Sequence, residues 1–253
     1  DFIDLFNRLS TNNIPNQKNL ITDSIFTNEN GKFIDIASVW NAPQYALMIS
    51  NSLNHEDLLN WIDKFTFEED ISISSPLKKK VISIFSNNKN NNLNIFGEIK
   101  KNEIINRNLG GVEVIFAHTS FFNDYKIINL ILDDDPKSAE LIESYLNLQD
   151  IFQMEENEFN SFRIKNRIPI CGNEIVSLYN PLEIGISHMI DFNKGCYVGQ
   201  EVIARLDTYD KVQRKLMILD NKKDLNIISS KGCDVTTSDD EYCLAVVKKN
   251  ILI

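Results

Sequence analysis

Residues 194–205 read KGCYVGQEVIAR. Gly195 and Gly199 flank a three-residue segment that carries the thiol of Cys196. Glycine tolerates positive φ and lets another part of the chain approach closely, so this spacing predicts a tight loop with Cys196 at its apex. A helix is predicted to follow the second glycine, because Glu201 in its first turn favours the positive end of the helix dipole.

The distribution of glycine also indicates special backbone geometry in this part of the chain. The sequence contains 9 glycines, about half the usual share of roughly 7%. Four of them lie at positions 172, 185, 195 and 199. A chain that is poor in glycine and gathers it in one stretch needs unusual backbone conformations there.

The neighbours of Cys196 favour the reactive thiolate form of its side chain. Lys194 lies two residues before the cysteine, and the positive end of the following helix would also lower the thiol pKa. A lone cysteine is otherwise often a small buried apolar residue. The flanking glycines and Lys194 favour the chemical interpretation over the structural one.

Phosphate binding is the competing use of a glycine-rich loop. The P-loop requires GxxxxGK[ST], and the dinucleotide fold requires GxGxxG after a strand. The sequence contains neither pattern. A nucleotide site is therefore not predicted.

Outward from this loop, the chain mixes helices and strands without strict βαβ alternation, which predicts an α+β fold. Apolar residues at i, i+3, i+4 and i+7 predict a first helix over residues 2–9. Further helices are predicted over 55–65, 136–148 and 158–166, and strands over 20–26, 32–40, 45–49, 71–74, 81–85, 93–99, 112–117 and 125–132. A hairpin loop is predicted at 28–31 and a solvated Asn-rich loop at 87–94.

The last forty residues differ from the rest, because polar turns separate short apolar runs. Strands are predicted over 211–219, 226–229, 233–237 and 242–248, which fits a small β-barrel or sheet domain.

Composition excludes several classes of protein. The 253 residues include 26 Lys and Arg against 36 Asp and Glu, a net charge of −10 that argues against a general nucleic-acid binder. No apolar run approaches the roughly 18–20 residues needed to span a bilayer. The four cysteines form no CxxC pair, so a structural zinc site is not expected and a reducing cytoplasm is the default. No signal peptide is visible, but Asp1 is not a natural start, so we expect further residues before it.

The segment KGCYVGQEVIAR resembles the signature of the YgfZ/GcvT-like folate-binding family, aminomethyltransferase-like proteins needed for iron–sulfur cluster maturation. The likeness spans nearly the whole chain, most strongly over 162–216 and most loosely over 40–150. Other matching motifs lie at 9–12 (L-x-T-N-D), 30–34 (K-G-R hairpin), 162–169 (R-I-E-x-G-I-P), 180–183 with 190–192 (P-x-E and I-x-F), and 212–216 and 244–247 (start and end of the barrel).

This resemblance implies a fold of two interlocked α+β subdomains, one of them ferredoxin-like, around a central channel. Residues 1–209 would form this folate-binding region, and residues 210–253 a small C-terminal β-barrel. The channel would bind tetrahydrofolate or a related reduced folate.

The resemblance also implies roles and partners. Cys196, with Lys194, would be the working thiol and a transient ligand of a metal or an iron–sulfur cluster. Because four ligands usually hold a cluster, it would be shared with a carrier or client protein. The relatives suggest a monomer, located in the bacterial cytoplasm or in the mitochondrial matrix of eukaryotes. It would serve processes such as tRNA modification, and it would contact neither nucleic acid nor a membrane. The residues expected to bind the ligand are Asp35, Arg163, Glu183, Tyr197, Gln200, Glu201 and Arg205.

Two residues depart from the family pattern. Lys165 stands where the relatives carry an acid that could bind the pterin ring, and an ammonium group cannot accept the pterin N–H bonds. Arg167 replaces the glycine of the same motif. Folate binding would then be weakened, the ligand would differ, or Glu183 or another acid would substitute. Arg163 and Arg167 could instead pair with the folate glutamate tail or be solvated at the surface.

A further departure concerns Asp35. Aminomethyltransferases carry an Asp-Asp pair after their glycine hairpin, whereas this chain has Asp35 followed by Ile36. The halved pair counts against glycine-cleavage chemistry. Asp35 could still contact a ligand or be an inward polar residue of a strand.

The other candidate side chains favour structural roles. The histidines lack metal-ligand spacing, the tryptophans are expected in the core with folate stacking as an alternative for the first, and the remaining cysteines are expected to be inert. These residues are His55, His118, His188, Trp40, Trp61, Cys171, Cys233 and Cys243, of which the last two could approach each other across a hairpin.

Three functions follow from these residues. The first is a folate-binding accessory protein for iron–sulfur cluster assembly or repair. The second is a folate-dependent aminomethyltransferase or other one-carbon transferase. The third is a non-enzymatic binding module that has lost folate, because of Lys165 and Arg167.

Overall fold

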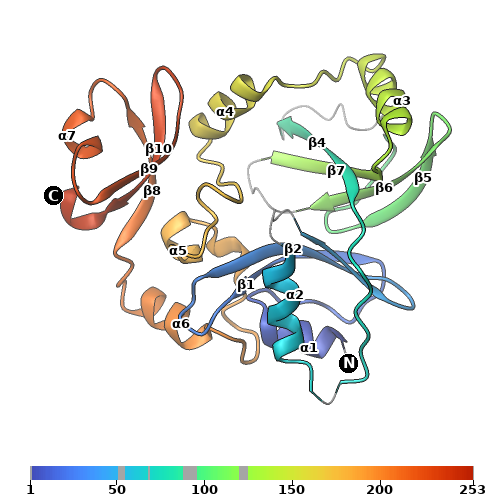
Figure 1. The fold of residues 1–253 in the computed structure, drawn as a ribbon, viewed down its shortest axis with the longest axis horizontal. Helices are drawn as coiled ribbons and strands as arrows, with labels where there is room; N and C mark the ends of the chain where they lie inside the picture. The colour runs from blue at the N-terminus through green and yellow to red at the C-terminus, as the bar shows by residue number, and fades with distance from the viewer. Residues whose placement is uncertain (1, 51–54, 68, 88–95, 120–124, 253) are drawn as a thin grey trace.

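The structure is a computed structural model that describes residues 2–50, 55–67, 69–87, 96–119 and 125–252. Its described strands form three sheets, with strand orders β1-β2-β3, β4-β7-β6-β5 and β8-β10-β9 (Figure 1). Neighbouring strands in every sheet are antiparallel. The α+β fold class is confirmed.

The first sheet is covered on one face by two helices. Its elements are α1 (Phe2–Leu9), β1 (Leu20–Thr27), β2 (Phe33–Asn41), β3 (Ala46–Ser50) and α2 (His55–Lys64). The apolar stripe of α1 and the buried residues of α2 pack against Phe26 and Val39 of the sheet. Burial of this stripe, and not helix propensity alone, stabilises so short a helix as α1.

The second sheet is covered by α3 and faces the first sheet. Its elements are β4 (Lys79–Asn87), β5 (Ile104–Leu109), β6 (Val112–Thr119), β7 (Tyr125–Asp133) and α3 (Pro136–Asn147). Ile142 and Leu146 of α3 pack on Phe116 and Leu130. In Figure 1 the first sheet lies below the second, and a core cluster that includes Ile21, Trp40, Ala117 and Ile131 fills part of the space between them.

The C-terminal third of the chain leads from a helix to a separate sheet at the left of Figure 1. Its elements are α4 (Glu156–Lys165), α5 (Pro181–Ile184), the 3-10 turn Ser187–Met189, α6 (Gln200–Thr208), β8 (Arg214–Asp220), α7 (Leu225–Ile228), β9 (Cys233–Ser238), β10 (Tyr242–Lys248) and the 3-10 turn Lys249–Ile251. The sheet buries Leu219, Cys243, Ala245 and Val247 in a small core of its own.

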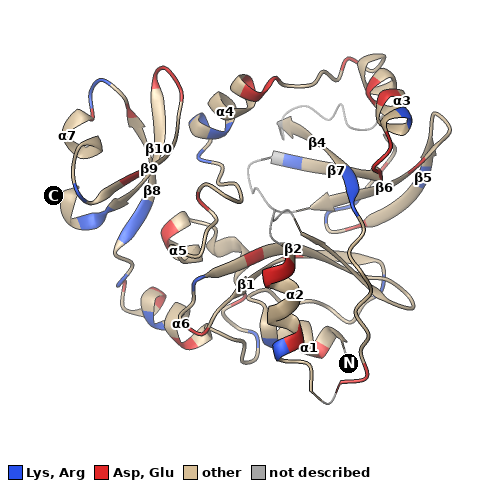
Figure 2. Ribbon diagram, viewed as in Figure 1, with Lys and Arg blue, Asp and Glu red and all other residues tan. Residues whose placement is uncertain are grey.

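Lys and Arg residues are dispersed along the three sheets and their helices, and acidic residues lie among them (Figure 2). Within the described ranges, no helix is both long enough and apolar enough to cross a bilayer.

The structure differs from the expected elements at several places. Residues 71–74 form no strand, and residues 226–229 lie largely in helix α7. The described part of 93–99 also contains no strand, while 87–94 lies almost entirely outside the described residues. Strand β5 was not predicted, because its alternate residues are polar and exposed. The Gly110-Gly111 turn that joins it to β6, with φ of 62° and 93°, was the available hairpin signal.

A buried ion pair fastens α4 to the C-terminal sheet. The Arg163 guanidinium donates to the Glu174 carboxylate (3.1 Å), and both side chains are fully buried. Arg163 also donates to Thr237 of β9 and to Asn160 (3.0 Å), and Glu174 accepts the Ile170 N–H (3.1 Å). A buried charge pair with its remaining hydrogen-bonding groups satisfied fixes the geometry of this junction.

Removing one charge of this pair should destabilise the protein strongly. We expect Glu174→Gln to lower the free energy of unfolding by about 3–5 kcal/mol, since it leaves Arg163 buried without a counter-charge. The matched control is the exposed pair Arg205–Glu201, where Glu201→Gln should cost no more than about 0.5 kcal/mol. Denaturant unfolding measures both, and equal small losses would contradict the structural role assigned to the buried pair.

Candidate functional site

The loop that carries Cys196 is fixed to the opposite end of the chain. The Val198 N–H donates to the Arg8 carbonyl at the end of α1 (2.9 Å), and the Thr27 hydroxyl of β1 donates to the Val198 carbonyl (2.8 Å). At the start of the loop, the Asp191 N–H donates to the Thr11 carbonyl (3.0 Å). The backbone is therefore held on both sides of the cysteine.

Lys194 anchors the same loop from its side chain. Its ammonium group donates to the carbonyls of Ser10 (2.9 Å) and Asn12 (2.5 Å) and to the Asn7 side-chain oxygen (3.2 Å). Burial lowers the pKa of Lys194 to about 8. These acceptors lie at and just beyond the C-terminal end of α1, where the helix dipole favours a cation. The structure thus gives Lys194 an anchoring role.

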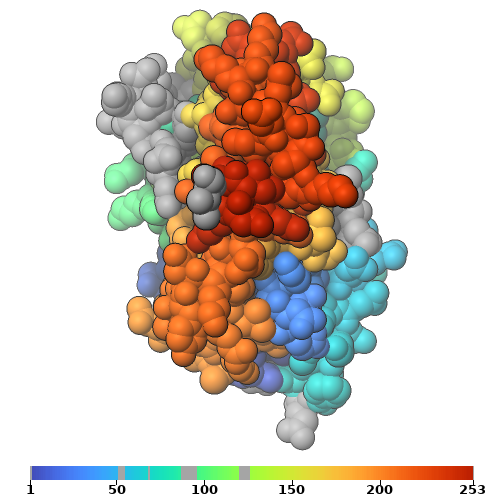
Figure 3. Space-filling model, turned by 90° about the vertical axis from the view of Figure 1, so that its left-hand side faces the viewer, coloured from blue at the N-terminus to red at the C-terminus, as the bar shows by residue number. Residues whose placement is uncertain are grey.

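The structure shows why one of the two glycines that flank Cys196, Gly199, has to be a glycine. Its φ is +85°, and a Cβ atom there would lie 2.6 Å from the Asn28 carbonyl oxygen and 2.7 Å from the Thr27 hydroxyl. Only glycine fits such a left-handed conformation in contact with another backbone. Figure 3 shows the blue β1–β2 hairpin directly beside the orange residues around α6, the contact that Gly199 permits.

Cys196 itself is exposed, in contrast to the other cysteines. Cys171 and Cys233 are half-buried, Cys243 is buried, and all four thiols are free. Burial raises the pKa of Cys171 to about 12, with a further rise from the Asp35 carboxylate, and burial also raises the pKa of Cys233 and Cys243. Strand register pairs Cys233 with Val247 and Cys243 with Ser238, so the two are not cross-strand partners.

This difference predicts the order of thiol alkylation. At pH 8 a thiol with a pKa of about 12 is ionised in only about one molecule in ten thousand, and thiolate is the nucleophile. We therefore expect iodoacetamide to modify Cys196 first and Cys171 far more slowly, as measured by peptide mass spectrometry over time. A Cys196→Ser control should lose the fast phase, and early labelling of Cys171 or Cys243 would contradict the assignment.

The residues that follow Cys196 divide between the core and the exposed side of α6. Tyr197 is 7% exposed and belongs to the core, where burial, with a smaller effect of the Asp191 charge, raises its pKa to about 12. Glu201 and Arg205 form an exposed pair on α6 (2.7 Å). Gln200 is the first residue of α6 and its N–H donates to the Tyr197 carbonyl (3.2 Å). Tyr197 thus has a packing role, and ligand contact by these residues stays a prediction.

Asp35 is buried within the first sheet. Its carboxylate accepts hydrogen bonds from the Ile36 N–H (2.7 Å) and from the Ser50 hydroxyl. Burial raises the pKa of Asp35, and the two hydrogen bonds oppose that rise. The inward polar position expected for a strand residue is the one observed.

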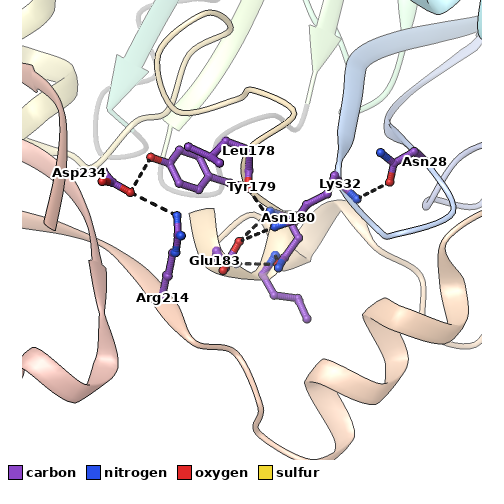
Figure 4. Close-up of polar contacts among 9 residues, drawn as sticks. Asn28, Lys32, Leu178, Tyr179, Asn180, Glu183, Arg214 and Asp234 are labelled. Atoms are coloured by element: carbon purple, nitrogen blue, oxygen red, sulfur yellow. Dashed lines mark hydrogen bonds and ion pairs between the residues drawn. The ribbon is translucent and has the colours of Figure 1, made fainter. Parts of the chain in front are cut away.

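Glu183 belongs to a polar cluster at the start of α5 (Figure 4). Its carboxylate accepts the Asn180 N–H (3.0 Å) and pairs with Lys32 (3.4 Å), while Asn180 caps the same helix turn. Beside it, Asp234 accepts from Arg214 (3.2 Å) and from the Tyr179 hydroxyl (3.4 Å). Glu183 thus has a capping role that joins the hairpin to α5, and its ligand role stays a prediction.

The R-I-E-x-G-like motif divides between the interior and the surface. Arg163 is fully buried in its ion pair with Glu174, which gives it a structural role, and its contact with a ligand stays a prediction. Lys165 and Arg167 are exposed. Arg167 has φ of +52°, so the backbone keeps the conformation that favours the glycine of the family motif.

The tryptophans lie in the core, and the histidines lie at half-buried or exposed positions. Trp40 and Trp61 are buried, as expected for core residues. His118 contacts the Ile99 carbonyl (3.1 Å), and burial lowers its pKa, whereas His55 and His188 are exposed. Across the described ranges, no three His, Cys, Asp or Glu side chains gather in a way that could hold a metal ion.

The structure adds a cavity of about 190 Å³ that the sequence did not predict. Buried Asp23 lies in its wall, and its carboxylate accepts a hydrogen bond from the Ser38 hydroxyl (2.5 Å). An acid inside the apolar run 20–26 was the available signal, since charged residues are rarely buried without a specific reason. The lining residues are Asn12, Thr22, Asp23, Lys101, Asn102, His188 and Met189.

Comparison with known proteins supports the fold. No protein-family model matches the sequence. A protein of Arabidopsis thaliana named "Putative transferase At1g60990, chloroplastic" is 25% identical over 223 residues, which cover 85% of this chain and 50% of that protein. The chain thus spans about half the length of the curated relative it matches. The crystal structure of glycine cleavage system aminomethyltransferase T from Bartonella henselae has a TM-score of 0.71 at 12% identity, covering 97% of this chain and 73% of that one. The fold is therefore similar to that of aminomethyltransferase T.

Proposed function

We propose that this chain is a folate-binding accessory protein for iron–sulfur cluster assembly or repair that acts through the Cys196 loop. The observation that carries the proposal is an exposed thiol on a loop held from both sides by the N-terminal segment. The KGCYVGQEVIAR signature and the likeness to the aminomethyltransferase T fold support it.

The proposal requires Cys196 to act as a ligand of iron. The thiol loses a proton and the sulfur binds iron, because thiolate is the form that ligates. One thiolate cannot hold a cluster that usually takes four ligands, so the cluster would be shared with a carrier or client protein. An exposed and fixed sulfur suits this transient contact, since the partner must reach it without rearranging the loop.

The folate part of the proposal rests on the fold and the family signature. In the proposed arrangement, residues 1–209 contain two interlocked subdomains around a channel for reduced folate, and residues 210–253 close as a small barrel. The three-stranded sheet β8-β10-β9 is compatible with such a barrel. The proposal places a monomer in the bacterial cytoplasm or in the matrix of a eukaryotic organelle. The chloroplast in the name of the plant relative favours an organelle if the source is eukaryotic.

A second candidate is a folate-dependent aminomethyltransferase. It is favoured by the names of the structural neighbour and of the plant relative. Ile36 after Asp35 counts against it, since the acidic pair of that chemistry is halved. Formation of methylene-tetrahydrofolate from an aminomethyl donor by the purified chain would support this candidate.

The proposed role is tested in cells that lack the chain. We expect the activity of iron–sulfur enzymes in their extracts to fall and to recover when the wild-type chain is expressed again. An enzyme without a cluster, assayed in the same extracts, is the control. Unchanged iron–sulfur enzyme activity in the deletion strain would contradict the proposal.

A further inference from the structure

Most of the negative charge of the chain lies in one segment. Residues 133–158 contain nine Asp and Glu residues against one basic residue, Lys137, which gives a net charge of −8 out of −10 for the whole chain. Figure 2 shows acidic residues in red along α3, the chain that follows it and the start of α4. In Figure 1, α3 lies at the opposite end of the molecule from α6, the helix that directly follows the Cys196 loop. The acidic segment is therefore distinct from that loop.

Several of these acids have a structural explanation, as partners of lysines or as parts of helix caps. They are Asp133, Asp134, Asp135, Glu155 and Glu158. Glu156 lies in the first turn of α4, where the helix dipole favours an acid. No ion pair joins Glu140, Glu143 or Asp150 to another residue that the structure describes. Mutual repulsion makes these three acids a cost to the stability of the fold.

Asp150 stands against two stabilising preferences at once. Its φ is +58°, a conformation that glycine usually supplies at the end of a helix. It also lies in the turn that closes the C-terminal end of α3, where the helix dipole favours a cation. The turn is nevertheless fixed, since the Asp150 N–H donates to the Asn147 carbonyl (3.2 Å) and the Ile151 N–H donates to the Leu146 carbonyl (3.1 Å). An acid kept at such a position points to a role in binding.

The same segment exposes large apolar side chains. Leu148 is 81% exposed and Phe152 is 71% exposed, and Leu141 is exposed as well. Leu141 and Leu148 are seven residues apart, so they lie on one side of the helix about two turns from each other. Ile151, between Leu148 and Phe152, packs on the core of the second sheet and holds this part of the chain in place. Exposed apolar residues with a charged rim are typical of a surface that binds another protein.

We propose that this surface docks a basic amphipathic helix of a partner protein. The surface, called the α3 surface below, consists of Leu141, Leu148 and Phe152 with Glu140, Glu143 and Asp150. Apolar residues on one face of the partner helix would cover the leucines and the phenylalanine, and its Lys and Arg side chains would pair with the carboxylates.

The charge of the α3 surface selects this partner over other macromolecules. A nucleic acid or an anionic membrane is repelled by a segment with a net charge of −8. A helix supplies apolar residues at two-turn spacing with basic residues beside them, which matches the spacing of Leu141 and Leu148. Neither folate nor Cys196 takes part in this contact.

The test is fluorescence anisotropy of the full chain with a labelled peptide of about 18 residues of Leu and Lys, long enough to form a helix, with its leucines on one face. We expect saturable binding to the wild type. The double variant Leu148→Ser with Phe152→Ser should raise the dissociation constant about 100-fold, because it removes two apolar anchors. Both side chains are exposed, so the fold should tolerate the change.

A second double variant tests the acidic rim. Glu143→Gln with Asp150→Asn should raise the dissociation constant about fourfold, since each exposed ion pair contributes about twofold. The matched control is Glu56→Gln with Asp63→Asn, which removes the same charge from exposed positions of α2. The control should bind the peptide like the wild type.

Three results would overturn the inference. The first is absence of binding, or equal binding of a scrambled peptide of the same composition that has no apolar face. The second is an equal effect of the α2 control and the acidic-rim variant, which would show attraction by net charge alone. The third is a dimer of the chain, seen by light scattering, that Leu148→Ser with Phe152→Ser abolishes, since a second copy would then occupy the surface. Thermal unfolding verifies that this variant is folded, and if it is not, the comparison of the two charge variants decides.

Discussion

We expect Cys196→Ser to abolish recovery of iron–sulfur enzyme activity in cells that lack the native chain, while the protein remains folded. A serine hydroxyl does not ionise near neutral pH and does not replace a thiolate as a ligand of iron. The side chain is exposed, so the substitution should change the free energy of unfolding by no more than about 0.5 kcal/mol. Enzyme activity in extracts and thermal unfolding of the purified variant measure the two effects.

The matched control for this variant is Cys171→Ala. It removes a half-buried thiol whose pKa is raised to about 12 by burial, so no ligation is expected from it at neutral pH. Cells with Cys171→Ala should retain the activity of the wild type. Full activity of Cys196→Ser would show that the thiol is not the working group.

The second large effect is expected from Gly199→Ala, which should lower the free energy of unfolding by about 2–5 kcal/mol. About 1–2 kcal/mol comes from the left-handed backbone conformation and about 1–3 kcal/mol from crowding. The crowding has a definite source, since the new methyl group would lie 2.6 Å from the Asn28 carbonyl oxygen. Denaturant unfolding gives the value, and loosening of the Cys196 loop should accompany it.

Gly195→Ala is the control on the other side of the cysteine. A Cβ atom there would meet nothing within 4 Å, and its φ lies outside the left-handed region. We expect a change of no more than about 0.5 kcal/mol. Similar losses in both variants would contradict the specific contact between Gly199 and the hairpin.

The sequence predicted those features that depend on local residues. The spacing of apolar residues located α1 and α2, Pro136 located the start of α3, and the glycines located the Cys196 loop and the start of α6. A glycine that must accept a positive φ is visible in the chain itself, and the contact partner at Asn28 is not. The loop was therefore predictable, whereas its attachment to the hairpin was not.

Contacts with distant partners were not predictable from the sequence. Arg163 resembled a ligand-binding arginine because Glu174 and Thr237, which enclose it, cannot be identified as its partners from sequence spacing. Glu183 likewise caps its own helix turn and pairs with Lys32 from the hairpin. Only the folded structure shows whether a charged side chain faces solvent, a ligand or the core, because only there are its neighbours known.

Buried Asp23 beside the cavity was missed for a related reason. Asp23 interrupts an apolar strand, but the pattern alone does not show that its carboxylate accepts the Ser38 hydroxyl of β2 beside a cavity, as that of Asp35 accepts the Ser50 hydroxyl of β3. The cavity arises where β1 meets the loop at Lys101 and the turn at Met189. The contact among these three segments depends on the folded structure and is not visible in the local sequence.

The most direct measurement is an anaerobic calorimetric titration of the purified wild-type chain with tetrahydrofolate. Saturable binding with a dissociation constant on the order of micromolar, about 8 kcal/mol of binding free energy, is the predicted result. It would establish that the chain recognises reduced folate despite Lys165. No binding up to millimolar ligand would contradict a folate-binding protein, and the Cys196 loop alone would then remain as the functional site.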